Sequence, residues 1–248
     1  MPRVSVVLPV YNTKEEHLRE CIDSILGQTF SDFELLIQND NSTDERVEQV
    51  VLSYTDNRIK YQKNEKNLGI SGTRNVLVGR ATGQYIAVMD HDDISMPTRF
   101  EKQVDFLDAH PEVGIVGTWC ETFPNGKVKK KPVNSDKIEA ALFYSCPILH
   151  PSAMMRKSIG IFYDARYSPS EDLALYCSLV GKTKFANLSE VLFHYRVHEE
   201  NTSKKQSEKM VRASKELRTA LRRKFPHLYK RALIDRFKQK LLRLVGIK

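Results

Sequence analysis

The chain has 248 residues, of which 41% are hydrophobic and 28% charged, and its formal net charge is +8. This length suffices for one α/β domain with a buried core, and the composition excludes a disordered or fibrous chain. The four cysteines are far apart and form no CxxC pair, so we expect reduced, mostly buried thiols rather than a zinc site.

The apolar stretch at residues 4–8 is too short for the core of a secretory signal peptide. No stretch reaches the roughly 20 apolar residues that a membrane-spanning helix requires. We therefore expect a cytoplasmic protein whose membrane contact, if any, is peripheral on the inner face. Lysines cluster at residues 127–131 and basic residues again after Lys204. No nucleic-acid-binding motif accompanies this charge, and an anionic membrane surface explains it equally well, so we expect no nucleic-acid partner.

Strand and helix patterns alternate through the first half of the chain. Apolar, β-rich stretches predict strands, and apolar residues at helical spacing predict helices between them. The expected strands span residues 4–10, 33–37, 59–61, 85–89 and 114–118, and the expected helices include 71–81 and a segment from Pro97 to Pro111. This alternation predicts an α/β domain with a doubly wound, mostly parallel sheet flanked by helices.

The second half is less regular. Short helices are expected at residues 135–143 and 172–180, a strand near 184–186, and a helix from Ser203 that is broken near Pro226. We expect one domain over residues 1–202, divided into a nucleotide-binding half (about 1–118) and an acceptor-side half (119–202). A basic, amphipathic helical extension follows over residues 203–248.

One helical face of that extension carries Leu233, Phe237, Leu241 and Leu244, and lysines and arginines surround it. Packing of this face onto the domain explains the pattern. Binding of the helix to an anionic membrane surface, where a lipid-linked acceptor would be presented, explains it equally well.

Polar residues follow three of the predicted strands. Ligands of parallel sheets bind beyond the carboxyl ends of the strands, where loops and helix N-termini converge. The loops expected at that edge contain Pro9, Tyr11 and Asn12, then residues 39–44, and then residues 90–93. Three such loops at one edge predict a binding site.

The third loop crowds three carboxylates, those of Asp90, Asp92 and Asp93, around His91. These charges repel one another unless a cation, protonation or open solvent relieves them. Mg²⁺ and Mn²⁺ prefer oxygen ligands, and Mg²⁺ commonly takes one or two carboxylates together with phosphate oxygens. A solvated acidic turn that caps the helix at Pro97 is the alternative, but the apolar strand before the loop favours a metal–diphosphate site.

Residues of the other loops suggest a uridine donor. The Asp40 carboxylate could accept a hydrogen bond from uracil N3–H, and Tyr11 offers a ring for stacking. The segment after Asp40 also has the composition of a helix N-cap, and both roles can hold together. Arg74, near the start of a predicted helix, could reach a phosphate or the loop near the base, although many arginines simply lie at the surface.

Two further segments are candidates for the chemistry. Glu171 and Asp172 stand at a predicted helix start, where carboxylates also serve as caps. Direct displacement onto a hydroxyl needs a base opposite the leaving diphosphate, and Asp172 is the candidate. His198 could complete an oxygen-rich metal shell, or contact the diphosphate together with Arg196, although a lone histidine is more often structural.

Taken in order, these segments resemble family 2 glycosyltransferases of the GT-A fold, over Val4 to about Asn201. The similarity lies in residues 4–12, 24–29, 39–44, 67–69, 74–75, 90–93 and 171–172. It implies that Asp40 binds uracil, that Asp90 and Asp92 form a DxD-like motif with Asp92 nearest the metal, and that Asp172 is the base of an inverting transfer. Asn67, Arg74 and His91 then belong to the nucleotide-sugar site.

The stretches at residues 150–152 and 195–198 are similar to those of bacterial enzymes that build lipopolysaccharide, capsule or other surface glycans. By this resemblance His150 and Glu171 lie on the acceptor side. The chain departs from the family at Asn39-Asp40-Asn41, where Asp-Asp-Gly is usual. Asp93 is a second departure, because it adds another candidate metal ligand.

The expected activity is the Mn²⁺- or Mg²⁺-dependent transfer of a hexose or N-acetylhexosamine from a UDP-sugar to a glycan or lipid-linked glycan. A nucleotidyltransferase making nucleotide-sugars is one alternative, but such enzymes commonly have a glycine-rich, basic loop where this chain has residues 10–13. A non-enzymatic, basic membrane-binding adaptor is the other, and it leaves the acidic loops unexplained.

Overall fold

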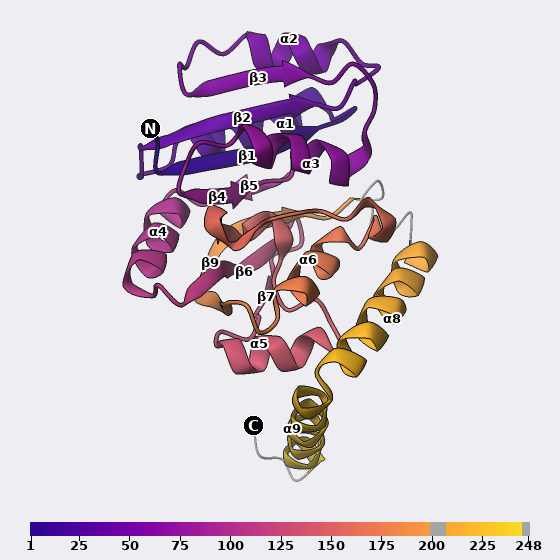
Figure 1. Ribbon diagram of the computed structural model, residues 1–248. Coiled ribbons are helices and arrows are strands. Elements are labelled where there is room, and N and C mark those ends of the chain that lie inside the picture. Colours follow the sequence, from indigo (N-terminus) through magenta and orange to yellow (C-terminus); the bar gives the residue numbers. More distant parts are fainter. Residues whose placement is uncertain (199–206, 245–248) are drawn as a thin grey trace.

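The computed structural model describes residues 1–198 and 207–244, with side chains described only as far as Lys238 (Figure 1). Within these residues nine strands form one sheet in the order β3-β2-β1-β4-β8-β6-β9-β5, and β7 pairs with β6. The strands are β1 (Val4–Val10), β2 (Phe33–Asn39), β3 (Ile59–Lys63), β4 (Tyr85–Val88), β5 (Ile94–Ser95), β6 (Val113–Phe123), β7 (Lys127–Lys129), β8 (Met154–Arg156) and β9 (Lys184–Arg196).

The sheet is parallel in its first half and mixed in its second. Strands β3, β2, β1 and β4 pair in parallel, as the alternation of elements predicts. Strand β8 then runs antiparallel to both β4 and β6, while β6 and β9 are parallel. The predicted parallel pairing therefore holds for the first half and for the long β6–β9 pair, whereas every antiparallel pair involves β5, β7 or β8, strands too short to show periodicity in the sequence.

Helices cover both faces of the sheet (Figure 1). One buried cluster joins α1, α2 and α4 to one face, and a second joins α3, α5, α6 and α8 to the other, which confirms the doubly wound arrangement. Every residue of β1 is buried because both of its faces are covered. The α-helices are α1 (Glu15–Leu26), α2 (Arg46–Leu52), α3 (Gly69–Arg80), α4 (Arg99–Ala109), α5 (Ser135–Leu142), α6 (Glu171–Leu179), α8 (Ser207–Lys224) and α9 (Pro226–Leu244), with 3₁₀ turns at His150–Ser152, Lys157–Ile159 and Ala165–Tyr167.

The two domain boundaries predicted from the sequence can be compared with the elements of the structure. The boundary expected between residues 118 and 119 falls inside β6, a continuous strand. The boundary expected between residues 202 and 203, like the predicted helix start at Ser203, lies outside the described residues. The break near Pro226 is confirmed, since Pro226 is the first residue of α9.

The C-terminal helices both pack on the domain and leave an apolar face in solvent. Leu221 of α8 and Ala232 of α9 are buried. Leu233, Ile234 and Phe237 of α9 are 44%, 55% and 69% exposed. The side chains of Leu241 and Leu244, predicted to extend this face, lie outside the described part. No described helix is both long and apolar enough to cross a membrane.

Two buried polar side chains attach α4 to the sheet beneath the acidic loop. Gln103 is fully buried and donates to the carbonyl oxygens of Val116 and Ser152 at 3.0 and 2.9 Å. Its own oxygen accepts from Arg99 Nε at 3.0 Å, and Arg99 donates in turn to the Val88 carbonyl. The end of β4 is therefore held by side-chain hydrogen bonds as well as by the sheet ladder.

Replacing Gln103 with alanine should lower the free energy of unfolding by about 2–4 kcal/mol, because two buried carbonyls and the Arg99 guanidinium lose partners and a cavity forms. Asp105→Ala, on the exposed face of the same helix, is the matched control and should change stability by less than about 0.5 kcal/mol. Urea unfolding followed by circular dichroism measures both. Equal stability of the two variants would contradict this role of Gln103.

Candidate active site

The parallel pairing of β1 with β2 and β4 brings the three predicted loops to one edge of the sheet. Asn12 joins the first two loops, since its backbone N–H donates to Ser42 Oγ at 3.1 Å and its Oδ1 accepts from the Thr43 N–H at 2.9 Å. Pro9 is buried within β1, whereas Tyr11 is 43% exposed. The first loop thus presents a tyrosine ring to solvent beside the second loop.

Asp40 organises the start of α3. Its carboxylate is nearly buried and accepts from the backbone N–H groups of Leu68 and Gly69 at 2.7 and 2.9 Å, and from Asn64 Nδ2 at 2.8 Å. Gly69 has a φ of +71°, a conformation that glycine adopts without steric cost. Asn67 Nδ2 donates to the Asp40 carbonyl. Three of the four hydrogen-bonding positions of the carboxylate are therefore engaged within the protein.

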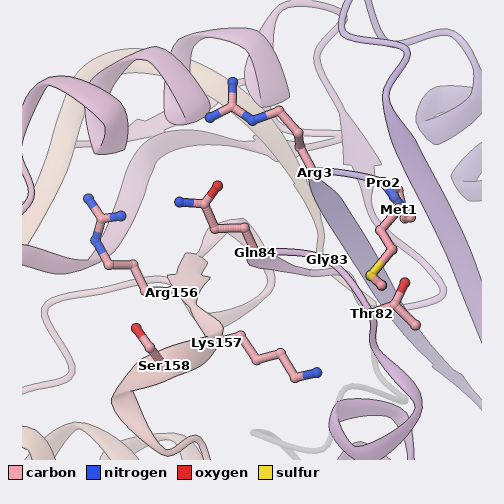
Figure 2. Close-up of a pocket in the computed structure, with 9 residues that line it drawn as sticks. All are labelled: Met1, Pro2, Arg3, Thr82, Gly83, Gln84, Arg156, Lys157 and Ser158. Atoms are coloured by element: carbon pink, nitrogen blue, oxygen red, sulfur yellow. The ribbon is translucent and has the colours of Figure 1, made fainter.

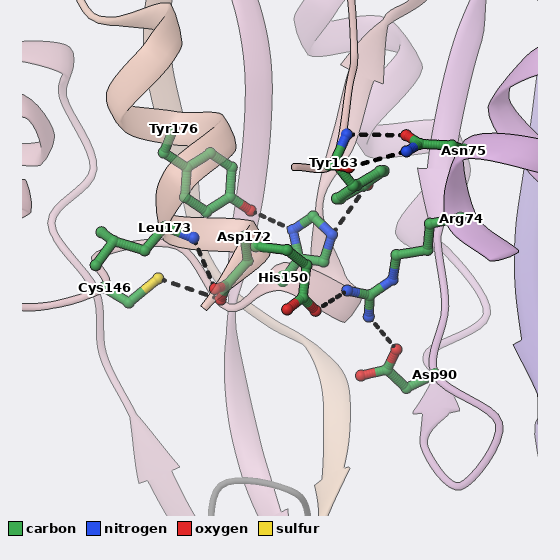
Figure 3. Close-up of polar contacts among 10 residues, drawn as sticks. Arg74, Asn75, Asp90, Cys146, His150, Tyr163, Asp172, Leu173 and Tyr176 are labelled. Atoms are coloured by element: carbon green, nitrogen blue, oxygen red, sulfur yellow. Dashed lines mark hydrogen bonds and ion pairs between the residues drawn. The ribbon is translucent and has the colours of Figure 1, made fainter. Parts of the chain in front are cut away.

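Arg74 links the acidic loop to the start of α6 (Figure 3). The side chain is 5% exposed, and its guanidinium lies 2.7 Å from an oxygen of Asp90 and 2.8 Å from an oxygen of Glu171. Proximity to these two carboxylates raises the pKa of Arg74 in spite of its burial. A phosphate contact, one of the roles expected for Arg74, would have to share a guanidinium that already has two anionic partners.

The acidic loop divides its carboxylates between the site and the core. Asp92 Oδ2 lies 2.7 Å from His198 Nε2, so the structure brings together two of the three residues proposed as metal ligands. Asp93 is 1% exposed, and its Oδ1 accepts from the Arg196 N–H at 2.8 Å. Burial raises the pKa of Asp93 well above its usual range. Asp93 therefore ties the loop to β9, whereas the side chain of Asp90 is 31% exposed beside Arg74.

The start of α6 holds the proposed base. Asp172 is partly buried, its Oδ1 accepts from the Leu173 N–H at 2.6 Å, and its Oδ2 lies 3.6 Å from Cys146 Sγ. Burial raises the pKa of Asp172 and also that of Glu171, although Arg74 opposes the shift at both. A higher pKa makes an ionised carboxylate a better proton acceptor.

His150 lies beneath the site rather than at its surface (Figure 3). It is 5% exposed, and both ring nitrogens are engaged, Nδ1 with the Tyr176 hydroxyl at 2.7 Å and Nε2 with the Tyr163 hydroxyl at 3.0 Å. Tyr163 also lies under the Arg74 guanidinium. The acceptor-side role expected for His150 would therefore be exerted through its tyrosine partners, because neither ring nitrogen faces solvent.

Several residues of this network were not predicted from sequence. Asn64 holds Asp40, Glu20 pairs with the Arg196 guanidinium, and Cys146 contacts Asp172. These contacts join residues between 24 and 176 positions apart. No local sequence pattern predicts partners so far apart in the chain, so only the folded structure identifies them.

A surface hollow lies at the opposite edge of the sheet, at the amino ends of β1 and β4 (Figure 2). Its lining includes Arg3, Gly83, Arg156 and Lys157. None of the predicted site residues contributes to it. Because the polar loops and the start of α6 meet at the carboxyl ends of the strands, we assign the active site to that edge.

Comparison with known proteins defines the class. Residues 5–160 match Glycosyl transferase family 2. A glycosyltransferase from Methanocaldococcus jannaschii is 34% identical over 79% of this chain and 71% of its own length. EpsE, a Bacillus subtilis glycosyltransferase, is 33% identical over 79% of this chain and 73% of its own. The amylovoran biosynthesis glycosyltransferase AmsE of Erwinia amylovora is 29% identical over 86% of this chain and 83% of its own length. The chain belongs to glycosyl transferase family 2.

Solved structures show the same GT-A fold. S. aureus TarS 1–349 in complex with UDP superposes with a TM-score of 0.69 at 21% identity, over 87% of this chain and 65% of that one. The chain spans 37% of the longer TarS structure. The mannosyltransferase PcManGT from Pyrobaculum calidifontis, in complex with GDP-Man and Mn²⁺, superposes with a TM-score of 0.64 at 17% identity. The match covers 94% of this chain and 74% of that one.

The free energy of unfolding should decrease below about pH 6.5 because of His150. Burial lowers the pKa of His150 well below its ordinary 6.5, so the folded state keeps the ring neutral while the unfolded state is protonated below about pH 6.5. The contribution of neutral His150 to the free energy of unfolding is fully present above pH 6.5. Below that pH it falls by up to about 1.4 kcal/mol per pH unit.

His150→Gln should therefore reduce the loss of unfolding free energy between pH 7.5 and 5.5 by about 1 kcal/mol, measured by urea unfolding at both pH values. His227→Gln, at an exposed histidine, should leave the pH dependence unchanged. The same pH dependence in both variants would show that His150 is protonated in the folded protein.

Proposed function

We propose that this protein is an inverting, metal-dependent transferase that moves a hexose or N-acetylhexosamine from a UDP-sugar to an acceptor hydroxyl. The observation that carries the proposal is the position of Arg74, within 2.8 Å of both Asp90 and Glu171. One guanidinium thereby holds the acidic loop, the proposed donor side, next to the helix that bears Asp172. A leaving group and a base must lie in this way on two sides of a reacting carbon.

The uridine part of the proposal rests on the first two loops. Tyr11 presents a ring at the carboxyl end of β1, and one hydrogen-bonding position of the Asp40 carboxylate, which no described residue occupies, would accept from uracil N3–H. TarS 1–349 has been solved with UDP and with UDP-GlcNAc, and PcManGT with GDP-Man, so folds of this type hold nucleotide-sugars with different bases. Asp40 and Tyr11 are the features of this chain that favour uracil.

The donor atoms of Asp90 and Asp92 suit Mn²⁺ or Mg²⁺. The described residues contain no group of three histidine, cysteine or acidic side chains that could hold a metal ion by themselves. Two carboxylates are, however, the usual protein contribution to a site completed by phosphate oxygens and water. A bound ion would neutralise charge on the departing diphosphate. His198, already in contact with Asp92, is in place either to complete the shell or to orient Asp92.

Asp172 is the proposed base. Its carboxylate would take the proton of the acceptor hydroxyl as that oxygen attacks the anomeric carbon, while the bond to the diphosphate breaks on the opposite face. Attack from the far face inverts the anomeric configuration. The Leu173 N–H orients one carboxylate oxygen, and the other remains near Cys146 Sγ. Glu171 is held by Arg74 and is the neighbouring acidic group on the acceptor side.

Synthesis of a bacterial surface polysaccharide is the biological setting that we propose; the name of AmsE, an amylovoran biosynthesis glycosyltransferase, supports a biosynthetic role of this kind. A lipid-linked glycan would be presented at a membrane surface. The exposed Leu233, Ile234 and Phe237 of α9, together with the basic side chains of Lys230 and Lys238, are suited to an anionic interface. We therefore propose a cytoplasmic enzyme that associates peripherally with the membrane.

Asp172→Asn should lower turnover on the order of 10²- to 10⁴-fold, the usual contribution of a positioned base, and leave UDP binding unchanged. The release of UDP from UDP-sugar in the presence of acceptor extract measures turnover, and calorimetry measures binding. Asp105→Asn, at an exposed aspartate of α4, should have no effect. Turnover near that of the parent would exclude Asp172 as the base.

Asp92→Ala should weaken Mn²⁺-dependent UDP binding by at least 10- to 100-fold, because even a partner in the outer shell of a metal typically contributes that much. Calorimetric titration of UDP with and without Mn²⁺ measures the difference, and Asp105→Ala serves as the control. An unchanged effect of Mn²⁺ on UDP affinity would show that Asp92 does not bind the metal.

A further inference from the structure

Four lysines lie on and after a hairpin in the acceptor-side half of the sheet. Strands β6 and β7 pair antiparallel, and Lys127, Lys129, Lys130 and Lys131 occupy β7 and the residues after it (Figure 1). We call residues 119–131 the basic hairpin. It contains these four lysines against a single acidic residue, Glu121. Its charge is therefore strongly positive.

The lysines of the basic hairpin are not neutralised within the protein. Among the residues that the structure describes, none of the four makes an ion pair with a carboxylate, whereas many other cations of the chain do. Lys129 Nζ instead lies 5.1 Å from the centre of the Tyr195 ring, and Lys130 Nζ lies 5.1 Å from the centre of the Trp119 ring. Lys130, beside the Trp119 ring, and the adjacent Lys131 lie on the other side of the hairpin from Lys129 and form a surface suited to an anionic ligand with an apolar face.

A short chain of contacts leads from the basic hairpin to the proposed base. Trp119 Nε1 donates to the Lys131 carbonyl at 2.9 Å, and Lys131 Nζ donates to the Cys146 carbonyl at 3.0 Å. Cys146 Sγ lies in turn 3.6 Å from the Asp172 carboxylate. Lys131 and Asp172 therefore contact the same residue, so the end of the basic hairpin lies next to the proposed base.

We propose that the basic hairpin is an acceptor subsite for a glycan that carries a phosphate or carboxylate group close to the reacting hydroxyl. The ammonium groups of Lys130 and Lys131 bind the anion, and the neighbouring Trp119 ring packs against the apolar face of a sugar. This proposal rests on the proposed function and adds the charge of the acceptor to it. The donor diphosphate is assigned elsewhere, to Asp90 and Asp92, so these lysines are available to the acceptor.

Trp119 provides a direct readout because it is the single tryptophan of the chain. Two pairs of probes separate the possible sources of the charge. Oligogalacturonate and neutral maltohexaose test charge on the glycan, and farnesyl diphosphate and farnesol test charge at a lipid linkage. Each probe is titrated into the full chain, with UDP and Mn²⁺ present, and tryptophan fluorescence is followed at two salt concentrations.

At least one charged probe should change the fluorescence with an affinity that falls with salt, and its neutral counterpart should not bind. The triple variant Lys129→Gln/Lys130→Gln/Lys131→Gln should weaken that binding by about tenfold or more. The matched control Lys137→Gln/Lys182→Gln/Lys184→Gln removes the same charge at exposed positions outside the hairpin and should bind as the parent does.

Calorimetric UDP binding with Mn²⁺ should be the same in both triple variants and in the parent. If UDP binds normally but no charged probe does, or if both triple variants lose the probe equally, the acceptor subsite is overturned and the donor proposal stands. If a charged probe binds through the hairpin while the parent protein fails to bind UDP, the donor proposal is the one that fails.

Discussion

The ion pairs of Arg74 are the interaction on which the site depends. Asp90 belongs to the loop after a parallel strand, and Glu171 to a helix that begins about 80 residues later; without a cation between them the two carboxylates and Asp172 would repel one another. A buried guanidinium is expensive to desolvate, and only the paired arrangement offsets that cost. The two halves of the site are therefore held together by charge as well as by packing.

The topology of the sheet explains why these groups meet. Parallel pairing of β2, β1 and β4 directs three loops to one edge of the sheet. Beyond β4 the sheet becomes mixed, and the antiparallel β8 follows directly after the His150 turn. His150 then binds Tyr176 of α6, four residues after Asp172. The second half of the sheet thus positions the start of α6, with the proposed base Asp172, against loops that the first half supplies.

The family match covers only part of the proposed site and ends before the C-terminal part of the chain. The match over residues 5–160 contains the three loops, Arg74 and the acidic motif, whereas Asp172, β9 and the C-terminal helices follow it. The basic hairpin lies within the match, yet its lysines make no ion pair within the described residues. The matched region therefore accounts for the class of this protein, while Asp172 and the C-terminal helices lie beyond that region.

The sequence alone determined the alternating elements of the first half and the three polar loops, because strand and helix periodicity and turn residues are local properties. It also placed Asp92 and His198 among the same candidates. The tertiary structure decided that Asp40 holds the start of α3, that Asp93 is buried, that Arg74 joins two carboxylates and that His150 is enclosed by tyrosines. These outcomes depend on partners distant in the chain, and no local pattern encodes which carboxylate will face the core and which will face solvent.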